Sequence, residues 1–361
     1  MKIDIIAGAR PNFMKISPII DEIRKYQSKG ISIEFRLIHT GQHYDENMSD
    51  SFFKQLKIPN PDFNLGVGSG TQAEQTAEIM IKYEQLIINY KPKICLVVGD
   101  VNSTMACSIV AKKMNIKVAH IEAGIRSNDL TMPEEINRMV TDSITDYFFT
   151  TSNYANQNLL NLGVPKSKIF FVGNTMIDTL IKNYENFIKP TFFIEMQLIP
   201  KKYLVLTMHR PANVDQENKL TKFLHIIEKN VRNNPVLFPV HPRTKNIISK
   251  IEFKFKNIRF IQPLSYLEFN YIVKNSMCVI TDSGGITEET TVMKIPCMTL
   301  RDNTERPETI KEGTNELIGT NPANLIPALK KLFNERWKIG SIPEKWDGKT
   351  AQRIIESLLQ I

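Results

Sequence analysis

This chain of 361 residues lacks the features of several large classes of protein. It has no run of about 18 apolar residues, so no membrane-spanning helix is predicted. Asp4 interrupts the first apolar stretch, which is therefore more typical of a β-strand than of a signal peptide. We expect a cytoplasmic protein with no membrane partner.

Cysteine is scarce, and its spacing suits neither a metal site nor a disulfide framework. No C-x-x-C pair is present, and each cysteine has apolar neighbours, so buried free thiols and no metal are expected. The cysteines are Cys95, Cys107, Cys278 and Cys297.

The sequence motifs of several enzyme classes are absent as well. The chain contains no G-x-S-x-G, no Walker loop and no G-x-G-x-x-G, which argues against a nicotinamide enzyme and predicts no cofactor. The net charge is +8, but lysine and arginine are dispersed and form no dense basic block. A lysine-rich surface with a site for a small anion explains this charge better than a nucleic-acid partner does.

Short apolar runs, many of them β-branched, alternate with helical patterns almost throughout the chain. This alternation predicts βαβ units, parallel sheets and an α/β fold with two Rossmann-like domains. Strands are predicted at residues 3–7, 33–39, 94–99, 118–122, 147–150, 169–172, 203–207, 236–240, 258–261, 278–281 and 297–300. Helices are predicted at 73–90, 104–114, 176–187, 266–275, 288–294, 324–334 and 350–359.

The domain boundary is expected between residues 173 and 201, where a helical segment is followed by two proline-containing turns. We predict an N-terminal domain over residues 1–173 and a C-terminal domain over 174–345. Residues 346–361 are predicted to form a helix that packs on either domain.

Polar motifs follow six of the predicted strands, where ligands bind in open parallel sheets. One of them is Asp-Ser-Gly-Gly at residues 282–285, followed by Glu289. Ser283, Gly284 and Gly285 would let a diphosphate approach a helix N-terminus, and Glu288 or Glu289 would accept hydrogen bonds from a ribose diol. The alternative is an ordinary strand–helix turn.

Cations follow the first predicted strand. Arg10 lies in the motif Gly-Ala-Arg-Pro, and Lys15 follows near the start of the next helix. Two cations there suit a leaving diphosphate, although a solvated loop would explain the same residues.

Three carboxylates are candidates for acid–base chemistry. Asp100 and Glu122 each end an apolar strand, and Glu134 begins a helix four residues before Arg138. A carboxylate at a buried strand end is costly unless it is paired or used. Alternatively, Asp100 caps the next helix, and Glu134 with Arg138 forms a surface pair.

Histidines follow two strands of the second half. His209, next to Arg210, ends the first of these strands, and His241 ends the second. Equivalent positions at two strand ends favour a role in binding phosphate or transferring a proton.

Taken in order, these motifs resemble a known family. They are Arg10 with Lys15, Gly99-Asp100, His120-Ile-Glu122-Ala-Gly, Pro133-Glu-Glu-x-Asn-Arg138, His209-Arg210, Asp282-Ser-Gly-Gly-x-x-Glu-Glu289 and Arg301-Asp-x-Thr-Glu-Arg306-Pro. Over nearly its whole length the chain resembles the UDP-N-acetylglucosamine 2-epimerases, chiefly the non-hydrolysing branch.

The resemblance implies a fold like that of the GT-B glycosyltransferases, with a cleft between two Rossmann-like domains, and a homodimer. It also implies anti elimination of UDP from UDP-GlcNAc to 2-acetamidoglucal, followed by re-addition to give UDP-ManNAc. By resemblance, Asp100, Glu122 and Glu134 handle the protons around C2, and His209 lies near the diphosphate. Phe269 lies against the uracil.

Alternative functions remain at this point. A hydrolysing relative would release ManNAc and UDP, a GT-B glycosyltransferase would need an acceptor, and a silent sensor would bind UDP-sugar without turnover. The segment His39-Thr-Gly-Gln-His43-Tyr-Asp also resembles relatives that act on modified UDP-sugars. UDP is therefore better defined by the sequence than the sugar is.

Overall fold

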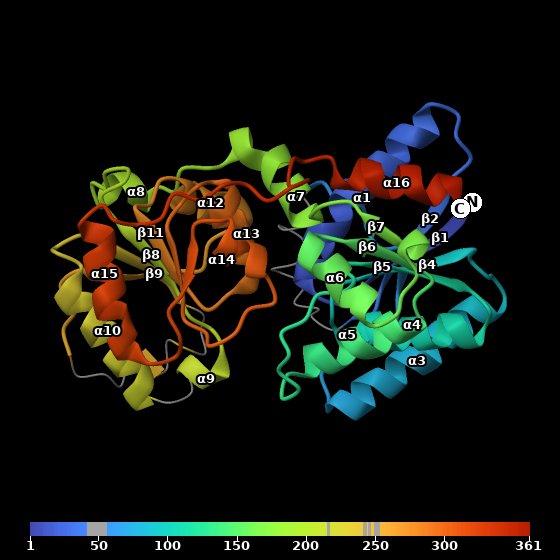
Figure 1. The fold of residues 1–361 in the computed structure, drawn as a ribbon, viewed down its shortest axis with the longest axis horizontal. Helices are drawn as coiled ribbons and strands as arrows, with labels where there is room; N and C mark the ends of the chain where they lie inside the picture. The colour runs from blue at the N-terminus through green and yellow to red at the C-terminus, as the bar shows by residue number, and fades with distance from the viewer. Residues whose placement is uncertain (42–55, 215–216, 241–243, 245–246, 249–252) are drawn as a thin grey trace. The chain divides into compact units, whose positions relative to one another are not determined.

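The computed structural model describes residues 1–41, 56–214, 217–240, 244, 247–248 and 253–361 (Figure 1). Two compact units divide the chain: unit 1 comprises Met1–Lys182 and Glu344–Ile361, and unit 2 comprises Asn183–Pro343. Each unit has its own parallel β-sheet, which confirms the predicted α/β class with two Rossmann-like domains. In the described part of the chain, no helix is long and apolar enough to cross a membrane.

Unit 1 has a seven-stranded sheet in the order β3-β2-β1-β4-β5-β6-β7. The order reverses beside β1, which pairs with both β2 and β4, and ligands bind beyond the strand ends at such a switch point. The strands are β1 (Lys2–Ala7), β2 (Glu34–His39), β3 (Phe63–Asn64), β4 (Ile94–Val98), β5 (Lys117–Ile121), β6 (Tyr147–Thr150) and β7 (Ile169–Phe171).

The helices of unit 1 cover both faces of its sheet, with α1 and α16 packed together on one face and α3, α4 and α5 on the other (Figure 1). They are α1 (Arg10–Ser28), α3 (Gln72–Ile88), α4 (Asn102–Lys113), α5 (Pro133–Ile144), α6 (Asn153–Asn161), α7 (Thr175–Asn183) and α16 (Thr350–Gln360), with the short η1 (Lys166–Lys168).

Helix α3 illustrates how the sequence specifies these elements. A capping box between Thr71 and Glu74 satisfies free backbone groups at the helix start. Ile79, Tyr83 and Ile87 recur every four residues and are completely buried. The amphipathic pattern therefore places one face of α3 in the core of unit 1.

The C-terminal segment returns to unit 1. Asp178 of α7 accepts hydrogen bonds from the backbone N–H groups of Thr350 and Ala351, the first residues of α16. The buried Trp346 indole N–H donates to the carbonyl of Thr151. The compact units thus change over after Lys182 and again before Glu344, whereas the sequence analysis drew its boundaries at residues 173 and 345.

Unit 2 has a six-stranded parallel sheet in the order β10-β9-β8-β11-β12-β13, with its switch point between β8 and β11. Its strands are β8 (Leu204–Thr207), β9 (Val236–Pro239), β10 (Ile258–Ile261), β11 (Cys278–Thr281), β12 (Cys297–Thr299) and β13 (Asn315–Leu317). Its helices are α8 (Phe192–Glu195), α9 (Pro211–Val214), α10 (Glu217–Asn230), α12 (Tyr266–Lys274), α13 (Gly284–Val292), α14 (Pro307–Lys311) and α15 (Leu325–Phe333), with η2 (Tyr184–Asn186) and η3 (Pro322–Asn324).

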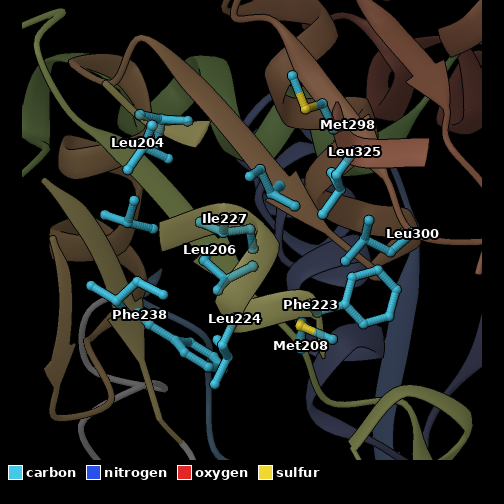
Figure 2. Close-up of a cluster of buried hydrophobic side chains, with 14 of the residues drawn as sticks. Leu204, Leu206, Met208, Phe223, Leu224, Ile227, Phe238, Met298, Leu300 and Leu325 are labelled. Carbon is cyan, nitrogen blue, oxygen red and sulfur yellow. The ribbon is translucent and has the colours of Figure 1, made fainter. Parts of the chain in front are cut away.

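One hydrophobic cluster fills the space between the sheet of unit 2 and helices α10 and α15 (Figure 2). Leu204 and Leu206 of β8 are fully buried there, with Phe223 and Ile227 of α10. Full burial stabilises each such side chain by roughly 1.5–3 kcal/mol. This core fixes β8, and with it the residues that follow its carboxyl end.

The structure confirms some details of the sequence analysis and corrects others. All four cysteines are buried free thiols. Strands β3 and β13 were not predicted, because two or three residues carry too little pattern. Helix α13 begins at Gly284, earlier than the predicted start at residue 288.

Candidate active site

In each unit, polar side chains gather at the switch point of the sheet. The first group, called the unit 1 site, comprises Lys15, Asp100, Glu122, Glu135 and Arg138. The second, called the unit 2 site, comprises His209, Asp282, Ser283, Gly284 and Glu289.

In the unit 1 site, Glu122 follows β5 and is almost completely buried. Its Oε2 lies 2.7 Å from the Lys15 Nζ, which α1 supplies. Glu122 has a φ of 69°, in the left-handed region that a residue with a side chain rarely adopts. Such strain persists only where the surroundings hold it, and it is common at functional sites. The structure therefore brings two of the predicted site residues, Lys15 and Glu122, into direct contact.

Asp100 lies in the turn after β4, partly exposed, and Arg138 of α5 holds it. Arg138 Nη2 is 2.5 Å from Asp100 Oδ2, and its Nη1 is 2.7 Å from Glu135 Oε2. Asp100 does not begin α4, whose N-cap is Val101. Asp100 therefore does not cap α4, which was the alternative role considered from the sequence; it pairs with Arg138 instead.

The first turn of α5 separates two neighbouring glutamates. Glu134 is exposed, whereas Glu135 is buried and accepts hydrogen bonds from the Ser127 and Asn128 N–H groups. Burial raises the pKa of Glu135, but these bonds and the one from Arg138 outweigh it and hold the pKa below its ordinary value. The surface pair of Glu134 with Arg138 is therefore wrong, because Arg138 is buried and pairs with Asp100 and Glu135.

Asn12 connects the two strand ends of the unit 1 site. Its Oδ1 accepts hydrogen bonds from the Gly8 and Ala9 N–H groups, and its Nδ2 donates to the Val98 carbonyl. The turn after β1 is thereby tied to the end of β4. Arg10 begins α1, and its side chain lies outside the described part of the structure.

In the unit 2 site, His209 follows β8 and Asp282 follows β11. His209 Nδ1 lies 2.7 Å from Asp282 Oδ1, and the histidine side chain is 60% exposed whereas the aspartate is fully buried. Asp282 also accepts hydrogen bonds from the backbone N–H groups of His209 and Arg210. Asp282 thus fixes the ring and leaves Nε2 for a ligand.

The carboxylate of Asp282 is kept ionised by its partners. Burial raises its pKa, but the hydrogen bonds from His209, Arg210 and Asn213 outweigh burial and lower the pKa below its ordinary value. The sequence analysis placed Asp282 only in a glycine motif and missed its contact with His209.

Helix α13 begins beside this pair, with Ser283 as its N-cap. Residues 283–286 are half-buried, whereas the next residues of the helix are buried. A Cβ added to Gly284 would meet nothing closer than Arg301 Nη1 at 3.8 Å, and neither Gly284 nor Gly285 has a positive φ. Neither packing nor backbone conformation requires glycine at 284, and an accessible helix N-terminus suits an anion.

Glu289 lies deeper in α13 and is buried. Burial raises its pKa to about 7, although Tyr266 Oη donates a hydrogen bond to it at 2.9 Å. Tyr266 and Phe269 both belong to α12, and Phe269 is half-buried. The structure therefore brings α12 against the helix that carries the predicted ribose ligand.

Two charged residues beside Gly284 were not predicted to belong to the site. Arg301 forms a two-point ion pair with Glu305, and Arg210 Nη2 lies 3.9 Å from Glu305. In the sequence, only the positions of Arg301 and Glu305 within the motif at residues 301–306 indicated that they belong to the site. His241, the remaining predicted site residue, lies outside the described residues.

The fold is that of a two-unit α/β protein with paired carboxylates at one switch point and a helix N-terminus suited to phosphate at the other. The family model described as UDP-N-acetylglucosamine 2-epimerase matches residues 25–359. The chain belongs to the UDP-N-acetylglucosamine 2-epimerase family.

Individual relatives agree with this assignment. The UDP-N-acetylglucosamine 2-epimerase of Methanocaldococcus jannaschii is 42% identical over 373 residues, covering 99% of both chains. A crystal structure of the epimerase from that organism, in complex with UDP-GlcNAc and UDP, matches with a TM-score of 0.88 at 41% identity over 100% of both chains. The UDP-2,3-diacetamido-2,3-dideoxy-D-glucuronate 2-epimerase of Pseudomonas aeruginosa is 38% identical, covering 88% of both chains.

Proposed function

We propose that this protein is a non-hydrolysing UDP-N-acetylglucosamine 2-epimerase that interconverts UDP-GlcNAc and UDP-ManNAc. Membership of the family and the match to an epimerase solved with UDP-GlcNAc and UDP support the substrate. The observation in this chain that carries the proposal is the arrangement of the unit 1 site, where fixed cations hold two carboxylates at neighbouring strand ends.

The reaction begins with removal of the proton on C2 by a carboxylate among Asp100, Glu122 and Glu134. The electrons of the C–H bond form a C1–C2 double bond, and the bond from C1 to the UDP oxygen breaks. UDP then leaves as an anion, and 2-acetamidoglucal remains. Anti geometry requires the base and the leaving group to lie on opposite faces of the sugar ring.

The unit 2 site binds UDP in this proposal. The N-terminus of α13 and the Nε2 side of His209 stabilise the charge that develops on the diphosphate as the C1–O bond breaks. Glu289 accepts hydrogen bonds from the ribose, and Phe269 packs against uracil. Arg10 and Lys15 are the remaining cations proposed for the sugar diphosphate.

The second half of the reaction reverses the first on the other face of C2. A second acid delivers a proton to C2, and the UDP oxygen re-forms its bond to C1. The proton returned comes from a carboxyl group that exchanges with water, so the solvent labels the product. Neither a nicotinamide cofactor nor a metal takes part in the proposed steps.

The test is incubation with UDP-GlcNAc in deuterated water, followed by proton NMR. We expect UDP-ManNAc with deuterium at C2 and no free UDP in step with product. Epimerisation without the label would contradict the elimination mechanism. Accumulation of free UDP and ManNAc in equal amounts would show a hydrolysing enzyme instead.

A second substrate deserves the same assay because a relative at 38% identity acts on UDP-2,3-diacetamido-2,3-dideoxy-D-glucuronate. A panel of UDP-2-acetamido sugars is expected to give the highest kcat/KM with UDP-GlcNAc. A higher value with the diacetamido uronate would move the proposal to that sugar. Residues 42–45 of the segment that suggested this sugar lie outside the described residues.

The homodimer and the cytoplasmic location stay predictions. Sedimentation of the purified chain is expected to give twice the mass of one chain, and a monomer at assay concentration would contradict the first of them.

A further inference from the structure

A buried histidine lies behind the unit 1 site, and the proposed reaction does not use it. His120 of β5 is completely buried, two residues before Glu122. Its Nε2 lies 2.8 Å from the carbonyl oxygen of Gly99, and its Nδ1 lies 2.8 Å from Asp142 Oδ1. Each ring nitrogen therefore faces an oxygen at hydrogen-bond distance.

Both of these oxygens are acceptors. A carbonyl oxygen only accepts hydrogen bonds, and so does an ionised carboxylate. A neutral imidazole carries a single N–H, so one of its nitrogens would direct a lone pair at an oxygen 2.8 Å away. Both contacts are favourable only if both ring nitrogens carry a proton.

Asp142 has the surroundings of an ionised group. Its Oδ2 accepts a hydrogen bond from the Gly124 N–H and lies 2.7 Å from Arg126 Nη1. Burial raises the pKa of Asp142, but His120 and Arg126 outweigh it and hold the pKa below its ordinary value. The proton between the two side chains therefore belongs on the histidine.

We propose that His120 donates a hydrogen bond from each ring nitrogen, as an imidazolium does, and acts as a positioning residue for the reaction by holding the Gly99–Asp100 peptide. The inference rests on the proposed function only in so far as Asp100 is catalytic. His120 has no exposed surface with which to touch a substrate.

Hydrogen bonds fix Asp100 from three directions. His120 binds the carbonyl of the peptide before it, and Asn137 Nδ2 donates to the carbonyl of Asp100 itself at 2.9 Å. Arg138 holds its carboxylate. Gly99 has a φ of 70°, so its peptide takes a conformation that local preferences do not fix, and His120 supplies the missing constraint.

The charge on His120 is tested by NMR of the wild-type protein with ¹⁵N-labelled histidine rings. We expect one histidine whose two ring nitrogens both show imidazolium shifts at about pH 8, where an unpaired histidine is mostly neutral. In Asp142→Asn this signal is expected to change to that of a neutral ring at the same pH. A neutral tautomer for His120 in the wild-type protein at that pH would overturn the inference.

The positioning role is tested by His120→Gln, with His225→Gln in α10 of unit 2 as the matched control. We expect kcat to fall about 10²-fold, as small misplacements of a reacting group do, while KM and UDP affinity by calorimetry stay within about threefold. The control should match wild type. A kcat near wild type in folded His120→Gln would also overturn the inference.

The two proposals fail separately. A wild-type protein that does not epimerise any UDP-2-acetamido sugar would contradict the proposed function, while the NMR signal of His120 would still report its charge. An active epimerase with a neutral His120 would contradict only the inference made here. If His120→Gln does not fold, kcat of Asp142→Asn, expected to fall about tenfold, decides the positioning role.

Discussion

Units 1 and 2 use the same sheet order, with the reversal beside the first strand of each, yet they equip their switch points differently. In unit 1 the strand ends carry carboxylates, and each has a cation within 2.7 Å. In unit 2 the carboxylate that follows β11, Asp282, is satisfied by backbone N–H groups and His209, and a helix N-terminus stays accessible. The comparison teaches that fold topology selects where a ligand binds, while side chains select the chemistry.

The physical reason for the difference is charge. In the proposed reaction the base near C2 must be ionised and held still, and fixed cations beside the carboxylates of unit 1 suit that role. The proposed diphosphate is an anion, and the accessible helix N-terminus of unit 2 with its buried aspartate suits such a ligand. The predictions below separate chemistry in unit 1 from binding in unit 2.

The largest effect is expected for Asp100→Asn in unit 1. This change removes a candidate base but keeps the shape of the side chain, so kcat should fall by about 10³-fold or more. UDP affinity, measured by calorimetry, should stay near wild type because unit 2 is unchanged. Full turnover with an added acceptor would instead indicate a glycosyltransferase. It would also contradict the assignment of the acid–base chemistry to unit 1.

His209→Ala in unit 2 is expected to lower kcat by about 10²-fold, because the ring that Asp282 orients no longer assists the leaving diphosphate. Steady-state kinetics and the UDP dissociation constant measure the effect. His225→Ala is the control for the loss of a histidine in the same unit. Near-normal kinetics in His209→Ala would remove this residue from the reaction.

Gly284→Ala is expected to weaken UDP binding by about tenfold without lowering stability. The added methyl group meets no protein atom closer than 3.8 Å but occupies the approach to the helix N-terminus. Gly285→Val should have the larger effect. Gly68→Ala, in an exposed segment of unit 1 with no atom within 4 Å of the added Cβ, is the control. Unchanged UDP affinity by titration would show that the diphosphate binds elsewhere.

The smallest effect is expected for Glu289→Gln, and it concerns stability. The pKa of Glu289 is raised from 4.5 to about 7, so folding favours the protonated form. Its contribution is complete below pH 4.5 and is lost as the pH rises through about 7, at about 1.4 kcal/mol per pKa unit. The variant should therefore unfold at higher denaturant concentration than wild type at pH 8, and at a similar concentration at pH 4.

That same variant sharpens the comparison, because a ribose ligand is kept for binding and not for stability. Glu289→Gln should gain stability at pH 8 and lose affinity for UDP. An equal UDP affinity in both proteins would leave Glu289 as a buried structural residue.

Much of this architecture followed from the sequence because buried parallel strands are continuous apolar runs. Ile258–Ile261 and Cys278–Thr281 were predicted with the bounds observed. The strand-end rule also predicted the positions of Asp100, Glu122 and His209. Two short strands at sheet edges, β3 and β13, were missed because their pairing comes from neighbours in space and not from local pattern.

Partners of charged side chains were harder to predict. Spacing along α5 suggested Glu134 for Arg138, whereas the structure pairs Arg138 with Glu135 and Asp100. Spacing alone cannot tell which helix face is buried, and only the packing of α5 beside α4 decides it. His209 and Asp282 are 73 positions apart in the chain, so the local sequence around either residue cannot predict their contact.

The sequence by itself determined the alternation of strands and helices, the family and the polar residue types at the strand ends, because these depend on local hydrophobic pattern and on motifs. Only the tertiary structure decided which charges meet. Charge pairing depends on the distance between side chains that distant segments supply, and the parallel sheets set those distances by bringing strand ends together.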